Sequence, residues 1–307
     1  MATGIISVGF HLTGHDSLSA LLLTVAGLLW LLLAAAFATT LLHDRARWQA
    51  LAANPPALTA VAATCVLGTR LALAGWRTAA GVLLALAVVV WPALLVSVMR
   101  HWKRPAPGAA FLVCVATQAI AVLAATLAAT NGDWLAWCAL AAFGAGIVLY
   151  GEALARFDFR QVLTGAGDQW ISAGAIAISA LAGSKLTALP LWSSGAHSVL
   201  RTTTFVLLAL DFAGYAILAV CEVYRPRPRY DIRRWSTVFP LGMTAVASLS
   251  TATAGHVPGL HGPGVVLLWV AAAVWLITFV GLLRDQAAVV PRAGGKDGPL
   301  GGSRRSG

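Results

Sequence analysis

Charged side chains are scarce in this sequence. Only 10% of the 307 residues are Asp, Glu, Lys or Arg, whereas 59% are apolar. A soluble globule of this length cannot cover its surface with so few polar groups, so most of the surface must face lipid. The formal net charge of +10 does not indicate nucleic-acid binding, because the basic residues are scattered at helix ends instead of gathered on one soluble face.

Cysteine is also scarce, and the patterns that indicate catalysis are absent. The four cysteines lie in apolar stretches without paired spacing, at Cys65, Cys114, Cys138 and Cys221. This arrangement argues against a disulfide framework or a metal cage, and we interpret them as packing residues. The chain shows no phosphate-binding glycine loop and no nucleophile paired with a base at membrane depth. His15, His256 and His261 fall in loops without ligand spacing. The sequence therefore predicts no cofactor, no metal and no enzymatic activity.

Long apolar runs are abundant instead. Five approach or exceed the roughly 20 residues that span hydrocarbon as a helix: 18–42, 79–99, 134–155, 202–223 and 265–283. Each follows a shorter segment rich in Ala, Gly, Ser and Thr, namely 2–13, 57–73, 109–128, 171–183 and 238–255. Pairing short with long gives five helical hairpins and about ten membrane helices. Residues 1–13 lack a basic start, so we expect no cleavable signal peptide.

The distribution of basic residues predicts the orientation. Seventeen follow the long helices or lie in the C-terminal tail: Arg45, Arg47, Arg100, Lys103, Arg104, Arg156, Arg160, Arg225, Arg227, Arg229, Arg233, Arg234, Arg284, Arg292, Lys296, Arg304 and Arg305. The loops inside the hairpins receive only Arg70, Arg77, Lys185 and Arg201. Because cytoplasmic loops hold the excess of Lys and Arg, both termini are predicted to be cytoplasmic in a multi-pass plasma-membrane protein. We expect a transmembrane domain over 1–286 and a disordered cytoplasmic tail over 287–307.

The two classes of segment predict a ring. Close helix contact in lipid needs small residues, so the short segments belong inside and the leucine-rich ones face lipid. A ring of small residues leaves room along its axis, which favours a pore. Sparse polar residues on the short segments are the candidate pore lining: Thr3, Ser7, His11, Thr117, Gln118, Ser172, Ser179 and Thr244. The alternative is that these side chains bond to their own helix or join neighbouring helices.

Three segments resemble a known family. They are 1–12 (MATGIISVGFHL), 170–179 (WISAGAIAIS) and 234–243 (RWSTVFPLGM), and they resemble the tellurite-resistance/C4-dicarboxylate transporter family. That family includes fungal malate and sulfite carriers and the slow-type anion channels of plant guard cells. The resemblance implies a homotrimer in which the odd-numbered helices of each protomer form a separate pore.

The resemblance also implies a gate. In that family a phenylalanine on the ninth helix plugs the pore, and by its place before a proline it corresponds to Phe239 here. Pro240 bends a helix and frees a backbone carbonyl, so a large ring beside it can project into a narrow axis. The alternative is that Phe239 only packs at the end of its helix.

Two intramembrane charges are candidates for function. Asp211 lies near the middle of a long helix, where an unpaired carboxylate is costly, and it is either a proton-coupling site or a hydrogen-bond acceptor between helices. Arg70 is expected to be the one cation on the inner helices, as an anion contact near the outer mouth or as an interfacial anchor. The field of the cytoplasmic arginines would concentrate anions before entry.

These observations predict an all-α polytopic membrane protein that lies in the lipid bilayer and transports a small anion across it. A membrane-embedded enzyme and a non-transporting membrane scaffold are the alternatives. The sequence leaves open which anion passes and whether the protein is a channel or a proton-coupled carrier.

Overall fold

The computed structural model describes residues 1–102, 104–226 and 230–293. Within these residues the chain forms helices and no named strand, apart from one isolated bridge between Ala106 and Phe157. Ten of the helices make up the bundle: α1 (Ala2–Leu12), α2 (Asp16–His43), α4 (Thr59–Leu73), α5 (Arg77–Arg100), α6 (Leu112–Asn131), α7 (Asp133–Leu154), α9 (Ile171–Thr187), α10 (Ser194–Tyr224), α11 (Trp235–Ala254) and α12 (His261–Ala293). The short helices α3 (Arg45–Ala52) and α8 (Gln161–Thr164) and five 3₁₀ turns connect them.

Four connections between consecutive bundle helices are tight turns. Gly14, Gly75 and Gly132 link α1 to α2, α4 to α5 and α6 to α7, with φ of 77°, 87° and 108°. His256 has a φ of 54° between α11 and α12. Glycine adopts this left-handed region without the steric cost that a Cβ imposes, so these turns reverse the chain within a few residues.

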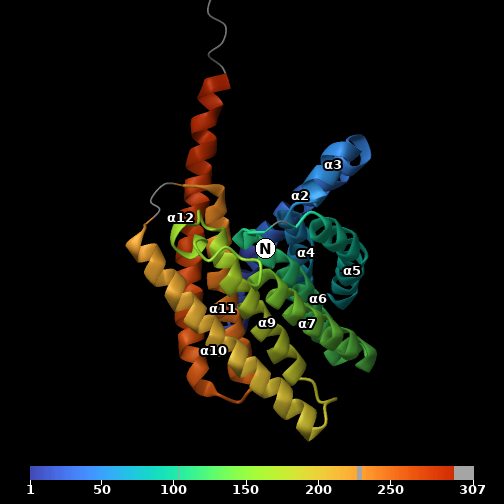
Figure 1. Ribbon diagram of the computed structural model, residues 1–307. Helices are drawn as coiled ribbons and strands as arrows, with labels where there is room; N and C mark the ends of the chain where they lie inside the picture. Colours follow the sequence, from blue (N-terminus) through green and yellow to red (C-terminus); the bar gives the residue numbers. More distant parts are fainter. Residues whose placement is uncertain (103, 227–229, 294–307) are drawn as a thin grey trace, which may run out of the picture.

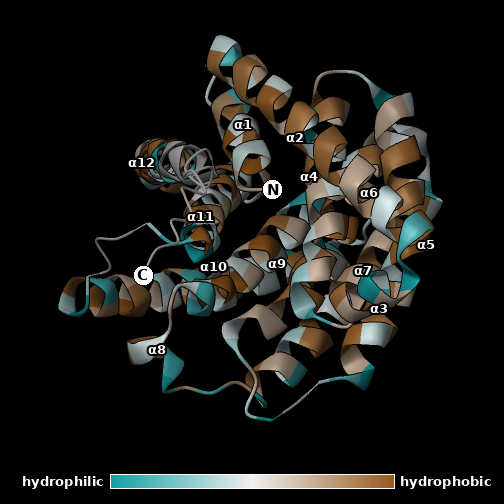
Figure 2. Ribbon diagram, turned by 90° about the horizontal axis from the view of Figure 1, so that it is seen from above, coloured by the Kyte–Doolittle hydropathy of each residue, from teal (hydrophilic) through white to brown (hydrophobic). Residues whose placement is uncertain are grey.

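The helices form two layers. We call α1, α4, α6, α9 and α11 the inner helices and α2, α5, α7, α10 and α12 the outer helices. Each inner helix contacts the next, from α1 through α4, α6, α9 and α11 back to α1. Each outer helix packs on the inner helix that precedes it in the chain and also on the next inner helix of this ring. Figure 2 shows the inner helices grouped around the middle of the molecule, with the outer helices around them.

Burial separates the two layers. In the most apolar window of residues 108–130, which include most of α6, 94% of the residues are buried, against 6% in the corresponding window of α2. Large apolar side chains of the outer helices are exposed, among them Leu33, Val89 and Ile277. Since such a surface is stable only against lipid, it defines the membrane-facing side.

Seven helices within the described residues are long and apolar enough to cross a membrane. The inner helices α1, α9 and α11 are not among them, and α1 is only 11 residues long. These three are rich in Gly, Ser and Thr because protein surrounds them, so they need less apolarity than a lipid-facing span. The chain is thus an all-helical protein with several membrane-spanning helices, and the count of ten stays a prediction.

Some element boundaries differ from the sequence-based ones. Helix α9 continues to Thr187, beyond the expected end at residue 183. Helix α12 continues to Ala293, beyond the expected domain boundary at 286, and residues 294–307 of the predicted tail lie outside the described residues. The helix α3 was not expected; Asp44 caps it by accepting a hydrogen bond from the Arg47 amide.

Candidate functional site

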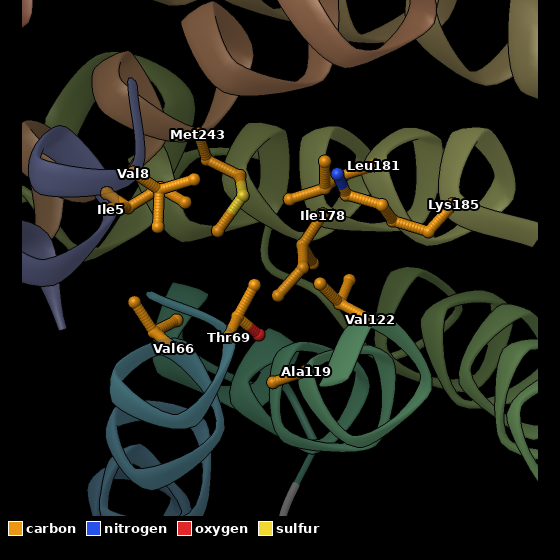
Figure 3. Close-up of a pocket in the computed structure, with 10 residues that line it drawn as sticks. All are labelled: Ile5, Val8, Val66, Thr69, Ala119, Val122, Ile178, Leu181, Lys185 and Met243. Carbon is orange, nitrogen blue, oxygen red and sulfur yellow. The ribbon is translucent and has the colours of Figure 1, made fainter. Parts of the chain in front are cut away.

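A small cavity lies between the inner helices (Figure 3). All five contribute to its lining, with Ile5 and Val8 from α1, Val66 and Thr69 from α4, Ala119 and Val122 from α6, Ile178, Leu181 and Lys185 from α9, and Met243 from α11. The cavity has a volume of about 10 Å³, measured as the space open to the centre of a water-sized sphere. This is room for about one water molecule, so the axis is narrow in this conformation.

Two of the ten lining residues carry polar side chains. The Thr69 hydroxyl donates to the Cys65 carbonyl at 2.9 Å, which satisfies its proton within α4. Lys185 lies in the last turn of α9. The expectation that Arg70 is the one cation on the inner helices is therefore wrong. The sequence-based prediction ends this helix at residue 183. Lys185 lies two residues beyond that end and is therefore assigned to a loop by that prediction.

Phe239 lies next to the cavity along α11. It is one turn before the cavity-lining Met243, so the two side chains share a face of the helix. Phe239 is 2% exposed, and it packs on Gly174 of α9, where a Cβ would lie 3.2 Å from Cε1 of the ring. Gly174 in turn precedes the cavity-lining Ile178 by one turn. The Phe239 ring therefore fills the space that the absent side chain of Gly174 leaves, on the side of the cavity nearer the N-terminal ends of α9 and α11.

Indole–threonine hydrogen bonds join the layers at three equivalent interfaces. In each, the Nε1 of a tryptophan on an outer helix donates to a threonine hydroxyl on the next inner helix: Trp30 to Thr64 at 2.9 Å, Trp91 to Thr117 at 3.0 Å and Trp275 to Thr3 at 3.0 Å. The hydroxyls of Thr64 and Thr117 also donate to backbone carbonyls of their own helices. Thr3 and Thr117 thus present their hydroxyls to the outer layer.

Asp211 occupies the corresponding interface between α10 and α11. The side chain is fully buried, and the Thr244 hydroxyl donates to its Oδ1 at 3.2 Å. Its Oδ2 is buried without a hydrogen-bond partner in the described part of the chain. A buried carboxylate oxygen without a donor is costly, so the second oxygen of Asp211 is an energetic cost within the bundle.

Arg70 belongs to a polar network between α1, α2 and α4. Its Nε donates to the Ser19 hydroxyl at 2.8 Å, and the Ser19 hydroxyl donates to the Ser7 carbonyl at 2.7 Å. The Ser7 hydroxyl donates to the Ser19 carbonyl at 2.7 Å. Arg70 is 5% exposed and its Nη1 has no partner among the described residues. The network links the middle of α1 to the start of α2 and the last turn of α4.

The other expected site residues make local or interlayer contacts. Gln118 donates to the Phe143 carbonyl of α7 at 3.1 Å, and His11 Nδ1 lies 2.8 Å from Asp16 Oδ1. Ser172 and Ser179 donate to the carbonyls of Gln169 and Ala175. The cavity lining contains none of the eight expected pore-lining residues, and their assignment stays a prediction.

The fold and the cavity define a class of protein. A layer of small-residue helices, enclosed by helices with exposed apolar faces and surrounding an axial cavity, is a polytopic membrane protein of the transporter or channel type.

Sequence comparisons identify the family. Residues 1–283 match the model of the SLAC1 family, described as voltage-dependent anion channels, and the chain belongs to this family. It is therefore a membrane protein of an anion-transporting family. It is similar to two proteins of Mycobacterium tuberculosis, the uncharacterized membrane proteins MT1776 (strain CDC 1551 / Oshkosh) and Rv1735c (strain H37Rv). Each is 33% identical over 136 residues, which are 41% of this chain and 67% of the relative. No solved structure matches the chain significantly.

Proposed function

We propose that the protein conducts a small anion across the plasma membrane along the axis of the inner helices of one protomer. The cavity to which all five inner helices contribute is the observation that carries this proposal. In this arrangement the ten bundle helices cross the membrane as five hairpins within a domain of residues 1–286, and the chain assembles as a homotrimer with one path in each protomer. Family membership supports an anion as the substrate.

The proposed orientation puts both termini in the cytoplasm. The excess of Lys and Arg after the outer helices supports it. The end of α12 and the end of α2 with α3 project on the same side of the bundle (Figure 1), as expected if outer helices end in the cytoplasm. In this orientation Phe239 lies on the cytoplasmic side of the cavity and Lys185 on the external side.

The proposed closing element is Phe239 with Pro240. The ring is buried against Gly174, on the helix face that leads to Met243 in the cavity. Pro240 removes one backbone hydrogen bond of α11 beside the ring, which allows local bending. An apolar ring in a narrow axis blocks a hydrated ion because water and the ion lose their hydrogen-bond partners there.

A labelling experiment tests the path. We expect the purified protein in proteoliposomes to conduct chloride or nitrate. In a background without native cysteines, a bulky thiol reagent should block the anion flux of the Thr69→Cys variant, because position 69 lines the cavity. Thr117→Cys is the matched control, since the Thr117 hydroxyl contacts Trp91 on the outer layer; reagent should leave its flux unchanged. Absence of flux in every variant and in the wild type would sink the proposed function. Block at position 117 and not at 69 would instead favour the polar residues as the pore lining.

A proton-coupled carrier is the second candidate function. The unpartnered, fully buried Oδ2 of Asp211 favours it, because a carboxyl without a donor binds a proton readily. In this case the reversal potential in a planar bilayer follows the pH gradient as well as the anion gradient, and Asp211→Asn abolishes the pH-dependent part. A reversal potential that is independent of pH in the wild type leaves Asp211 as an interhelical acceptor for Thr244.

A further inference from the structure

Lys185 is an isolated cation in the lining of an apolar cavity. The cavity lining holds no acidic side chain, and Thr69 is its one other polar residue. Lys185 makes no hydrogen bond or ion pair with the rest of the described chain. It is also the one lysine within the described residues, because Lys103 and Lys296 fall outside them. An ammonium group retained in such surroundings needs an anion or water as its partner.

The direction of the side chain distinguishes this lysine from an interfacial anchor. An anchoring lysine near the end of a membrane helix extends towards the headgroups. Figure 3 shows the opposite course: the Lys185 side chain runs back along α9, and its nitrogen lies beside Leu181, one turn deeper in the helix. This course follows the tilt of side chains towards the helix N-terminus. The Lys185 side chain therefore lines the cavity, and its nitrogen lies at the level of Leu181, which also lines it.

We propose that the Lys185 ammonium group is an anion-binding site of the path and that it takes one small monovalent anion of the size of chloride or nitrate. This inference rests on the proposed function, because the site lies on the proposed path. One positive charge neutralises one negative charge, and the lining offers no second cation. A dicarboxylate carries two separated charges, and its second carboxylate would have no cation to pair with in this lining.

Charge variants test the site in proteoliposomes. Lys185→Gln should lower chloride flux about tenfold, because an ammonium group in an apolar cavity attracts an anion far more strongly than the same group in water. Lys185→Arg keeps the charge and should retain most of the flux. Arg77→Gln is the matched control, since Arg77 begins α5 at the same end of the bundle and is exposed outside the cavity. Equal flux in Lys185→Gln and Arg77→Gln would overturn the proposal, as would wild-type transport of succinate at the rate of chloride.

A binding measurement keeps the proposal separate from transport. The rate at which an amine-reactive ester acylates Lys185 in the purified wild-type protein is followed by mass spectrometry of the peptide that contains it. Chloride or nitrate should slow the reaction relative to gluconate at equal ionic strength, because a bound anion covers and stabilises the ammonium form. Identical rates in the three salts would refute the site. Protection without any wild-type flux would retain the site and refute the proposed function instead.

Discussion

Replacing Phe239 by alanine is expected to raise anion flux by about tenfold, which corresponds to a barrier lowered by about 1.4 kcal/mol. The ring is buried on the helix face that leads to the cavity, and it packs on a residue without a side chain. Removing the ring leaves an opening between α9 and α11 next to Met243. Gly174 has no side chain that could fill it. Water can then join the cavity to the cytoplasmic side, and the hydrophobic constriction is lost. Flux is measured in proteoliposomes by the quenching of an anion-sensitive dye.

The control must separate a gate from a loosened core. Phe143 of α7 is also buried, but it contacts Gly183 and Gln118 at an interface between the layers. Phe143→Ala should lower the free energy of unfolding by about 3 to 5 kcal/mol, as much as Phe239→Ala, but should not increase the anion flux. Phe239→Leu should give a flux between that of the wild type and Phe239→Ala. If Phe239→Ala folds and conducts no more than the wild type, the ring only packs at its helix end.

The bundle helices were predictable because their signals are long and repeated. The apolar runs of about 20 residues are helical in the structure, as their length predicts. Ends were less predictable. The predicted end at residue 183 left Ser184 and Lys185 out of α9, although the helix continues to Thr187. Within it, the hydroxyls of Ser184 and Thr187 donate to carbonyls of the preceding turn.

The cavity could not be predicted from polarity. Its lining is almost entirely apolar, so residues such as Ile178 and Met243 look like ordinary core residues in the sequence. The polar residues that stand out in small-residue helices are engaged elsewhere. Ser7 and Thr69 illustrate the difference. Thr69 lines the cavity. Ser7 adjoins the cavity-lining Val8, but its hydroxyl points towards Ser19 on α2. A rotation of about 100° per residue separates the axial face from the interlayer face, and only the packed structure shows which is which.

Gly108→Ala is expected to be the most destabilising single-methyl change in the bundle, because the new Cβ would meet backbone that cannot rotate away. It would collide with the Asp168 carbonyl group and lie 2.6 Å from the Gln169 amide nitrogen. The turn before α6 would have to separate from the turn before α9, and the hydrogen bond from the Gly108 amide to Gln161 Oε1 would be lost. We expect a loss of about 3 kcal/mol and a melting temperature in detergent lowered by roughly 5–10 °C.

The matched control is a glycine of the bundle with open space around it. At Gly144 of α7, an added Cβ would have no neighbouring atom within 4 Å, so Gly144→Ala adds a methyl group facing lipid. Alanine also loses less backbone entropy than glycine in a helix, and this variant should melt at or slightly above the wild-type temperature. If Gly108→Ala and Gly144→Ala gave the same melting curve, the turns before α6 and α9 would not be held in contact. The inner layer would then lack the connection that fixes α6 against α9 across the cavity, and the narrow axis would have to be maintained by helix packing alone.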